Sequence, residues 1–470
     1  MVAILASYTV TPKEETPKGF LWLSDNDQLW RWSHTPLLYI YKPNHNNVDV
    51  HVLVETMRGS LGQILVHYYP LAGRLSWTKG CRLELDCNAK GAVLLEAEST
   101  KSAVELGDFS PNNESVKELI PTVDYSRPIE ELPLFVAQVT RFHGSNVIAI
   151  GILWSHPLGD GSAAIHFINS WAKLTQGRTI NANELPFLDR TVLKPPSHQP
   201  SRRFDHREFK PLPLVLGKTD NIEEQKKKTT FAQLKLTPIQ VQKLRKNANK
   251  NAKSQRQYTR FEVIGAYIWR CASKARRELK ENQPTAAKLN VNIRNRLNPP
   301  LPERYFGNAL APTVTPTCYV GDIISRPLSY TTQKIREAVE RVSSNEYLRS
   351  QMDFIAKKER WDSIRTPYLE RGEYRADVPF FGNPNIILGS WMSMPAYEAD
   401  FGWGKPLHFG PGAVCPYDRA MISLRPQEED SHGVDDVVVF LHFQEAYMQD
   451  FIKFFWEDIR ESSCSTQAKL

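Results

Sequence analysis

The sequence lacks the features that mark membrane, metal-binding and secreted proteins. No apolar run approaches the roughly 20 residues that a membrane-spanning helix needs. The six cysteines are scattered, with no C-x-x-C pair and no histidine at metal-ligand spacing, so we predict reduced thiols and no metal site. The N-terminal segment has no basic leader and only a short apolar run, which argues against a signal peptide. Together these absences predict a cytoplasmic protein that does not bind a membrane.

The chain also carries little net charge. Its 59 Lys and Arg against 52 Asp and Glu give +7 over 470 residues, which gives no reason to expect a nucleic-acid partner. Basic residues do gather at 226–256, but Phe231 is the one aromatic residue among them, fewer than the base stacking of single-strand binding would require. This run is typical of a solvated face, and the alternative is contact with a phosphate-rich ligand such as coenzyme A.

The length predicts two domains, because single hydrophobic cores stop growing at roughly 250–300 residues. Hydrophobic residues make up 41% and charged residues 24% of the chain, so most of it should fold. Residues 194–228 are rich in proline and charge, which disfavours helix interiors and central strands. We therefore predict an N-terminal domain at 1–193, a crossover loop at 194–228 and a C-terminal domain at 229–470. Helix and strand signals alternate on both sides, which favours α/β or α+β halves.

A strand, a turn and a helix follow one another around His156. Residues 147–154 form an apolar, β-branched run of strand length. Two glycines and a proline at 155–161 then predict a turn, and the apolar period of 162–174 predicts a helix. A side chain at the end of a buried strand is held rigidly and can still be reached by a ligand.

The pattern H-x-x-x-D occurs three times, beginning at His45, His156 and His432. His45 and His432 lie in polar segments that read as surface loops, and only His156 ends an apolar strand. A buried histidine often only satisfies backbone groups, so His156 is either a structural residue or a general base.

A second unusual segment, at 397–412, combines glycines and aromatic residues around Asp400. It cannot form a regular helix, and its glycines allow the backbone to approach a ligand or another loop closely. Asp400 is therefore part of a functional site or of a tight turn clamped by aromatic rings.

Together these segments resemble the BAHD acyltransferases along nearly the whole chain. The two family signatures, H-x-x-x-D-G and D-F-G-W-G, stand as HPLGDG at 156–161 and DFGWG at 400–404. Further matches are HYYPLAGRL at 67–75, PFLDR at 186–190 and RNRLNPPLPERYFGNAL at 294–310. The segment LWLSDNDQ at 21–28 is similar to the spermidine hydroxycinnamoyl transferase branch.

The resemblance implies a fold and a reaction. The fold is an α/β, mixed-sheet, chloramphenicol-acetyltransferase-like architecture, in which two similar-sized domains enclose a channel. In the reaction, His156 is the general base that takes the proton from the acceptor as it attacks an acyl-CoA thioester directly. Imidazole suits this task because its ordinary pKa of about 6.5 lies near neutral pH. Acyl-CoA is a co-substrate, no cofactor or metal is bound permanently, and the family-like state is a monomer.

The resemblance also implies roles for residues around the two signatures. Asp160 is expected to pair with an arginine and hold its loop. Asp400, grouped with the catalytic residues, is expected to pair with Arg294 or Arg296 and so brace the two halves. Trp403, or a backbone N–H near it, is expected to stabilise the oxyanion. The other supporting positions are glycines: Gly161, Gly402 and Gly404.

Substrate contacts follow from the same resemblance. Coenzyme A contacts are placed at Thr259 and Arg294, although the family's usual D-G-R-S-R reads N-I-R-N-R at 292–296, which makes the aspartate position neutral. Acceptor contacts are placed at Ser393 and Glu398. In relatives that use shikimate or quinate, an arginine that holds the acceptor's carboxylate stands at the position of Ser393. Its absence favours a cationic acceptor.

We therefore predict an acyltransferase that moves a hydroxycinnamoyl group to a polyamine such as spermidine and forms an amide. One rival within the class is an ester-forming transferase that uses shikimate or quinate. A rival from another class is a degenerate family member that only binds small molecules, but the intact signatures at 156–161 and 400–404 argue against it.

Overall fold

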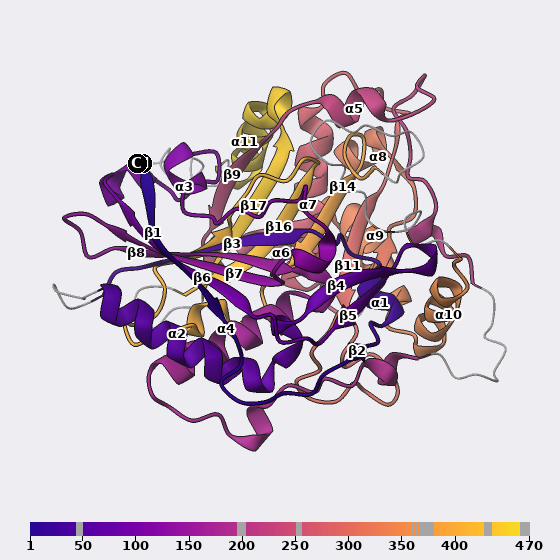
Figure 1. The fold of residues 1–470 in the computed structure, drawn as a ribbon. Helices are drawn as coiled ribbons and strands as arrows, with labels where there is room; N and C mark the ends of the chain where they lie inside the picture. Colours follow the sequence, from indigo (N-terminus) through magenta and orange to yellow (C-terminus); the bar gives the residue numbers. More distant parts are fainter. Residues whose placement is uncertain are drawn as a thin grey trace.

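Two six-stranded mixed sheets form the centre of the molecule, as Figure 1 shows. The structure is a computed structural model that describes residues 1–43, 50–194, 204–250, 256–359, 361, 365, 380–426 and 435–460. Within these ranges no helix is both long and apolar enough to cross a bilayer. The same residues include no group of three His, Cys, Asp or Glu side chains that could hold a metal ion.

The first sheet has the strand order β1-β6-β7-β8-β3-β15. Its β6 and β7 are parallel and the other neighbours are antiparallel. Every residue of β8 is buried, as its continuous apolar sequence predicts. The strands are β1 (Val2–Val10), β3 (His34–Tyr41), β6 (Ala92–Ser99), β7 (Phe135–Phe142), β8 (Ile148–Ser155) and β15 (His408–Pro411).

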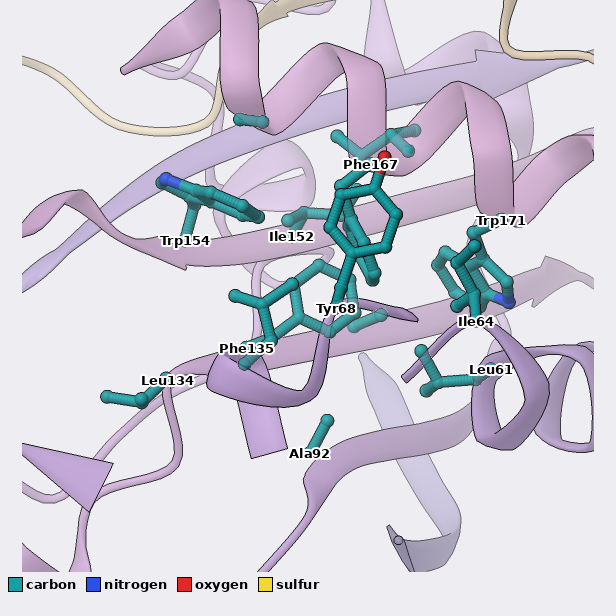
Figure 2. Close-up of a cluster of buried hydrophobic side chains, with 14 of the residues drawn as sticks. Leu61, Ile64, Tyr68, Ala92, Leu134, Phe135, Ile152, Trp154, Phe167 and Trp171 are labelled. Carbon is teal, nitrogen blue, oxygen red and sulfur yellow. The ribbon is translucent and has the colours of Figure 1, made fainter. Parts of the chain in front are cut away.

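Helices α2 (Val50–His67) and α4 (Gly161–Thr175) cover one face of this sheet. Aromatic rings fill the layer between them, and Figure 2 shows this cluster of buried side chains. The ring of Tyr68 meets Phe167 edge-on at 5.1 Å, and Phe135 meets Trp171 at 5.8 Å. Edge-to-face pairs add to the hydrophobic burial, so this core holds α4 firmly against β8.

The second sheet has the strand order β12-β11-β14-β16-β17-β9. Here β14 is parallel to both β11 and β16, and the outer pairs are antiparallel. The strands are β9 (Thr229–Leu236), β11 (Ala287–Asn292), β12 (Leu310–Val314), β14 (Ile386–Ser390), β16 (Arg419–Arg425) and β17 (Asp436–Gln444).

A second group of helices covers the outer face of this sheet and shares its core. Its members are α6 (Pro238–Asn249), α7 (Arg260–Ala275), α8 (Val320–Ser325), α9 (Leu328–Arg341) and α11 (Glu445–Arg460). The smaller elements are β2 (Phe20–Leu21), β4 (Arg74–Thr78), β5 (Arg82–Asp86), β10 (Pro284–Thr285), β13 (Cys318–Tyr319), α1 (Asp25–Gln28), α3 (Glu114–Lys117), α5 (Ile222–Lys226) and α10 (Asn345–Ala356).

The predicted α/β, mixed-sheet fold is confirmed, and so is the strand, turn and helix around His156. The strand is β8 and the helix is α4. The two sheets are not separate in sequence, because β15, from the C-terminal half, pairs with β3 of the first sheet. Part of the predicted crossover, 195–203, lies outside the described residues, and the division at 193 and 229 stays a prediction.

Candidate active site

The HPLGDG loop is held at both ends by regular structure. β8 ends at Ser155, His156 opens a single 3-10 turn, and α4 begins at Gly161. The carboxylate of Asp160 caps α4 by accepting hydrogen bonds from the N–H groups of Ser162 (3.1 Å) and Ala163 (3.2 Å). These contacts fix the position of His156 relative to the strand and the helix.

Gly161 allows another segment to pack directly on this loop. A Cβ atom at that position would lie 2.7 Å from the terminal methyl group of Met394. A larger residue there would displace the side chain of Met394, and the supporting role of Gly161 stays a prediction.

Two segments that are distant in the sequence also bond to the backbone of this loop. Arg190 donates to the carbonyl of Leu158 at 2.7 Å and forms a buried ion pair with Asp27 at 2.8 Å. Asn308 donates to the carbonyl of His156 at 2.9 Å and to Asp27 at 2.9 Å. The matches at 21–28, 186–190 and 294–310 thus converge on the backbone of the HPLGDG loop.

Asp160 also joins the loop to the C-terminal half. Its carboxylate forms a two-pronged ion pair with Arg294, at 2.7 and 3.0 Å, and accepts a hydrogen bond from the N–H of Ala309. Burial alone would raise the pKa of Asp160, but the charge and hydrogen bonds of Arg294 outweigh it and keep the pKa below its ordinary value. Asp160 therefore pairs with an arginine, as the resemblance implies.

His156 faces a cavity between the two sheets. Its ring is stacked on Trp30, with centroids 4.4 Å apart and planes at 8°. Burial lowers the pKa of His156 to about 4, and the charges of Arg31 and Arg419 contribute to the shift. The imidazole is therefore neutral at pH 7 and able to accept a proton.

Three cations line the same cavity: Arg31 before β3, Lys288 on β11 and Arg419 on β16. Sequence reasoning missed all three, and it also missed Trp30. A usable signal existed for Lys288 alone. At 287–292 the polar residues Lys288, Asn290 and Asn292 alternate with apolar ones, which is typical of a strand with one polar face.

The DFGWG loop has a different construction from the one predicted. Oδ1 of Asp400 accepts hydrogen bonds from the N–H groups of Gly402 (2.7 Å), Trp403 (3.0 Å) and Gly404 (2.9 Å). Gly402 and Gly404 have φ values of +100° and +92°, which favour glycine. The glycines let the loop wrap around its own carboxylate, and their supporting role in catalysis stays a prediction.

The predicted ion pair between Asp400 and Arg294 or Arg296 is wrong. Arg294 pairs with Asp160, and Arg296 donates to Ser343. Asp400 already receives three N–H groups from its own loop, so its charge is stabilised locally. Of the two signature aspartates, Asp160 is the one whose carboxylate links the two halves.

Trp403 packs on the first core. Its ring meets Tyr41 edge-on at 5.2 Å and is stacked on Phe401 at 5.7 Å. Neither Trp403 nor Asp400 is among the described residues that line the cavity of His156. The oxyanion role of Trp403 stays a prediction with no contact to His156 behind it.

A second pocket is lined by the predicted acceptor residues Ser393 and Glu398, together with Asp400. Met394 lines both this pocket and the cavity of His156. Ser393 is exposed, and Glu398 forms an ion pair with Lys405 at 2.8 Å. The structure therefore places both predicted acceptor residues on the far side of Met394 from His156, and their contact with an acceptor stays a prediction.

The two predicted coenzyme A contacts are bonded within the protein. Thr259 caps α7 by accepting a hydrogen bond from the N–H of Glu262 at 3.2 Å. Besides Asp160, Arg294 donates to the carbonyls of Tyr305 and Gly307. Their contact with coenzyme A also stays a prediction. His45 and His432 lie outside the described residues.

The comparisons with known proteins agree on one class of protein. A family model described as the Transferase family matches residues 1–457. The hydroxycinnamoyl-CoA:piscidic acid hydroxycinnamoyltransferase of Actaea racemosa is 40% identical, over 98% of this chain and 100% of the relative. The shikimate O-hydroxycinnamoyltransferase of Nicotiana tabacum is 34% identical, over 97% and 99%. The crystal structure of F. sporotrichioides TRI101 complexed with coenzyme A and T-2 has a similar fold, with a TM-score of 0.74, 17% identity and coverage of 92% and 97%.

Fold, site and relatives together define an acyl-CoA-dependent acyltransferase, of the O- or N- type. More particularly, the chain belongs to the BAHD acyltransferase family and is similar to its hydroxycinnamoyltransferases.

Proposed function

We propose that this enzyme transfers a hydroxycinnamoyl group from coenzyme A to a hydroxyl group of an acceptor that carries a carboxylate. The observation that carries this proposal is the charge of the cavity. Arg31, Lys288 and Arg419 line it together with His156. Glu208 is the one carboxylate residue among the described lining residues. A cavity with this balance attracts anions.

The charge of Glu208 is already engaged with neighbouring side chains. Its carboxylate accepts hydrogen bonds from Tyr347 at 2.7 Å and from Gln351 at 2.5 Å, and it lies 3.0 Å from a ring nitrogen of His206. These bonds hold the pKa of Glu208 below its ordinary value even though burial alone would raise it. Glu208 is thus committed to its neighbours rather than available to a cationic acceptor.

The relatives support an anionic acceptor as well. Their names specify piscidic acid and shikimate, and both are carboxylic acids. The expected spermidine acceptor fits poorly, because a polyamine would bring positive charge beside Arg31 and Lys288. An alcohol also avoids a cost that an amine meets: an amine with a pKa near 10 must first lose a proton, at roughly 4 kcal/mol at pH 7.

Flat rings supply the surface for the hydroxycinnamoyl group. The described residues that line the cavity include seven aromatic side chains, which can stack on a planar acyl group: Trp30, Trp154, Phe209, Phe381, Trp391, Phe409 and Tyr417. Both relatives described above are named as hydroxycinnamoyltransferases.

In the proposed reaction, the acceptor hydroxyl attacks the thioester carbonyl while His156 takes its proton. The tetrahedral intermediate then collapses, the C–S bond breaks, and His156 returns the proton to the departing thiolate of coenzyme A. The new ester and free coenzyme A leave with atoms and charge balanced. A carboxylate in the cavity would also offset Arg31 and Arg419, which raises the pKa of His156 and makes it a stronger base.

A competition assay tests this function. The enzyme receives p-coumaroyl-CoA and an equimolar mixture of shikimate, quinate, piscidic acid and spermidine, and the products are identified by mass spectrometry. We expect esters of the acids and a loss of product in His156→Ala. A spermidine amide as the main product would restore the polyamine reading. Absence of any acyl-CoA consumption would favour the degenerate binding protein.

A further inference from the structure

Lys288 is a half-buried cation that lines the cavity of His156. In β11, Ala287 and Leu289 belong to the core behind the sheet, whereas Lys288 and Asn290 line the cavity of His156 on the opposite face. The Lys288 ammonium lies 3.8 Å from the centroid of the Phe381 ring. Among the described residues, no carboxylate lies within ion-pair distance of this ammonium group.

The surroundings of Lys288 disfavour its charge in the empty enzyme. Burial lowers the pKa of Lys288 to about 8, and the charge of Glu208 opposes that shift only in part. The ring of Phe381 contributes a cation–π contact, which is weaker than a direct ion pair to a carboxylate. A lysine whose role was to stabilise the fold would be paired, because an unpaired buried charge costs stability.

We propose that the ammonium group of Lys288 binds the carboxylate of the acceptor and thereby selects acids over neutral alcohols. This inference rests on the proposed function, because it assumes that the acceptor enters the cavity of His156. A carboxylate at Lys288 supplies the missing counter-ion inside a low-dielectric site, where a charge-assisted hydrogen bond is strong. The hydroxyl of the same molecule is then free to reach His156.

The test compares an acid with its own ester. Shikimate and methyl shikimate carry the same hydroxyl groups and differ in one charge, and piscidic acid with its dimethyl ester gives a second pair. We expect wild-type kcat/KM to favour the acid by about 10- to 100-fold, the range of one hydrogen bond between charged groups. In Lys288→Met the preference should fall to about threefold or less, through a higher KM for the acid, as loss of one such bond implies.

Two variants separate binding from folding. Lys288→Arg keeps the charge and should keep most of the preference. Lys235→Met removes a lysine that is paired with Asp436 at 2.7 Å on β9, away from the cavity, and should leave the acid-to-ester ratio unchanged. The thermal midpoint of Lys288→Met should stay the same or rise, because a buried charge is removed. If Lys288→Met does not fold, Lys288→Gln serves the same comparison.

Three outcomes would overturn the inference. An unchanged acid-to-ester ratio in Lys288→Met would reject it while the acyltransferase function stands. Equal losses for acid and ester, with a higher KM for p-coumaroyl-CoA, would assign Lys288 to the donor instead. Acylation of spermidine but of none of the acids or esters by the wild-type enzyme would reject the proposed function and this inference together.

Discussion

The two signature loops differ in where their side chains go. The HPLGDG loop points His156 into the cavity between the sheets, and its aspartate, Asp160, ties the loop to Arg294. The DFGWG loop turns its aspartate, Asp400, onto its own backbone and packs Trp403 against the first core. One loop therefore carries a candidate for proton transfer, and the other shapes the chain beside it.

Both aspartates have structural contacts, but the two side chains differ in burial. Asp160 is almost fully buried and bonds groups from two halves of the molecule. Asp400 is partly exposed beside the second pocket, and the hydrogen bonds of its carboxylate are confined to its own loop. The lesson is that equally distinctive motifs can differ in kind, and variants at each loop can measure that difference.

The largest effect is expected from His156→Ala. Loss of a general base should lower kcat by about 10²- to 10⁴-fold with little change in thermal midpoint. The control is His442→Gln. His442 is a buried histidine of β17 that accepts a hydrogen bond from the N–H of Cys415 and does not line the described part of the cavity. That variant should lose stability but keep its turnover per folded molecule. Near-normal turnover in His156→Ala would remove this residue from the mechanism.

The next largest effect concerns stability and tests the ion pair between Asp160 and Arg294. Arg294→Met leaves the buried carboxylate of Asp160 without its ion pair, so we expect a loss of about 3–5 kcal/mol in the free energy of unfolding, measured with urea. Arg296→Met removes a half-buried arginine that donates to Ser343, and should cost about 1 kcal/mol or less. Equal losses in both variants would show that the ion pair of Asp160 is not special.

The pH dependence of the rate sharpens the account of His156. With a pKa of about 4, its imidazole is about 90% neutral at pH 5, whereas an unperturbed histidine would be about 3% neutral. Since kcat/KM reports the free enzyme, it should stay nearly constant from pH 7 to 5 and fall only below that on the acid side. A decline centred near pH 6.5 would show that the cavity does not desolvate His156.

Acid also affects folding through the same group. Unfolded histidine takes up a proton near pH 6.5, but folded His156 does so only near pH 4. Its contribution to stability is therefore complete above pH 6.5 and is lost as the pH falls toward 4. The rate profile must accordingly be accompanied by circular dichroism at each pH.

Sequence patterns predicted the local frame of the HPLGDG loop well. The apolar run, the turn glycines and the helical period all act over short distances, and they place His156 between β8 and α4. The lining of the cavity could not be read in this way. Arg31, Lys288 and Arg419 come from distant segments, and only the pairing and packing of strands in two sheets brings them together.

The partner of Asp400 shows a second limit. An aspartate can bond an arginine far along the chain or N–H groups a few residues away, and a sequence does not rank these options by itself. The two glycines that follow Asp400 were a usable local signal, because they permit the positive φ values that bring three N–H groups onto one carboxylate. The distant arginine partner of Asp400 was predicted from the family resemblance alone.

Asp400→Ala should have a moderate effect that falls on stability first. Three N–H groups of the DFGWG loop lose their acceptor, which should cost about 1–3 kcal/mol in the free energy of unfolding. We expect kcat to fall less than tenfold for the enzyme that remains folded. Asp400→Asn keeps an acceptor oxygen and should recover most of the stability. Abolished turnover with an unchanged thermal midpoint would instead make Asp400 a catalytic residue.

The smallest effect is expected from Trp403→Phe, and a second tryptophan provides its matched comparison. Trp403 packs edge-on against Tyr41, and phenylalanine can keep that contact, so kcat should change less than about threefold. Trp30 is stacked on the ring of His156, and Trp30→Leu should lower kcat more, because a misplaced base works poorly. If Trp403 stabilises the oxyanion through its indole N–H, removing that donor should lower kcat by about 10²-fold or more at an unchanged thermal midpoint. That result would give the DFGWG loop a direct role in catalysis. The two loops would then no longer differ in kind.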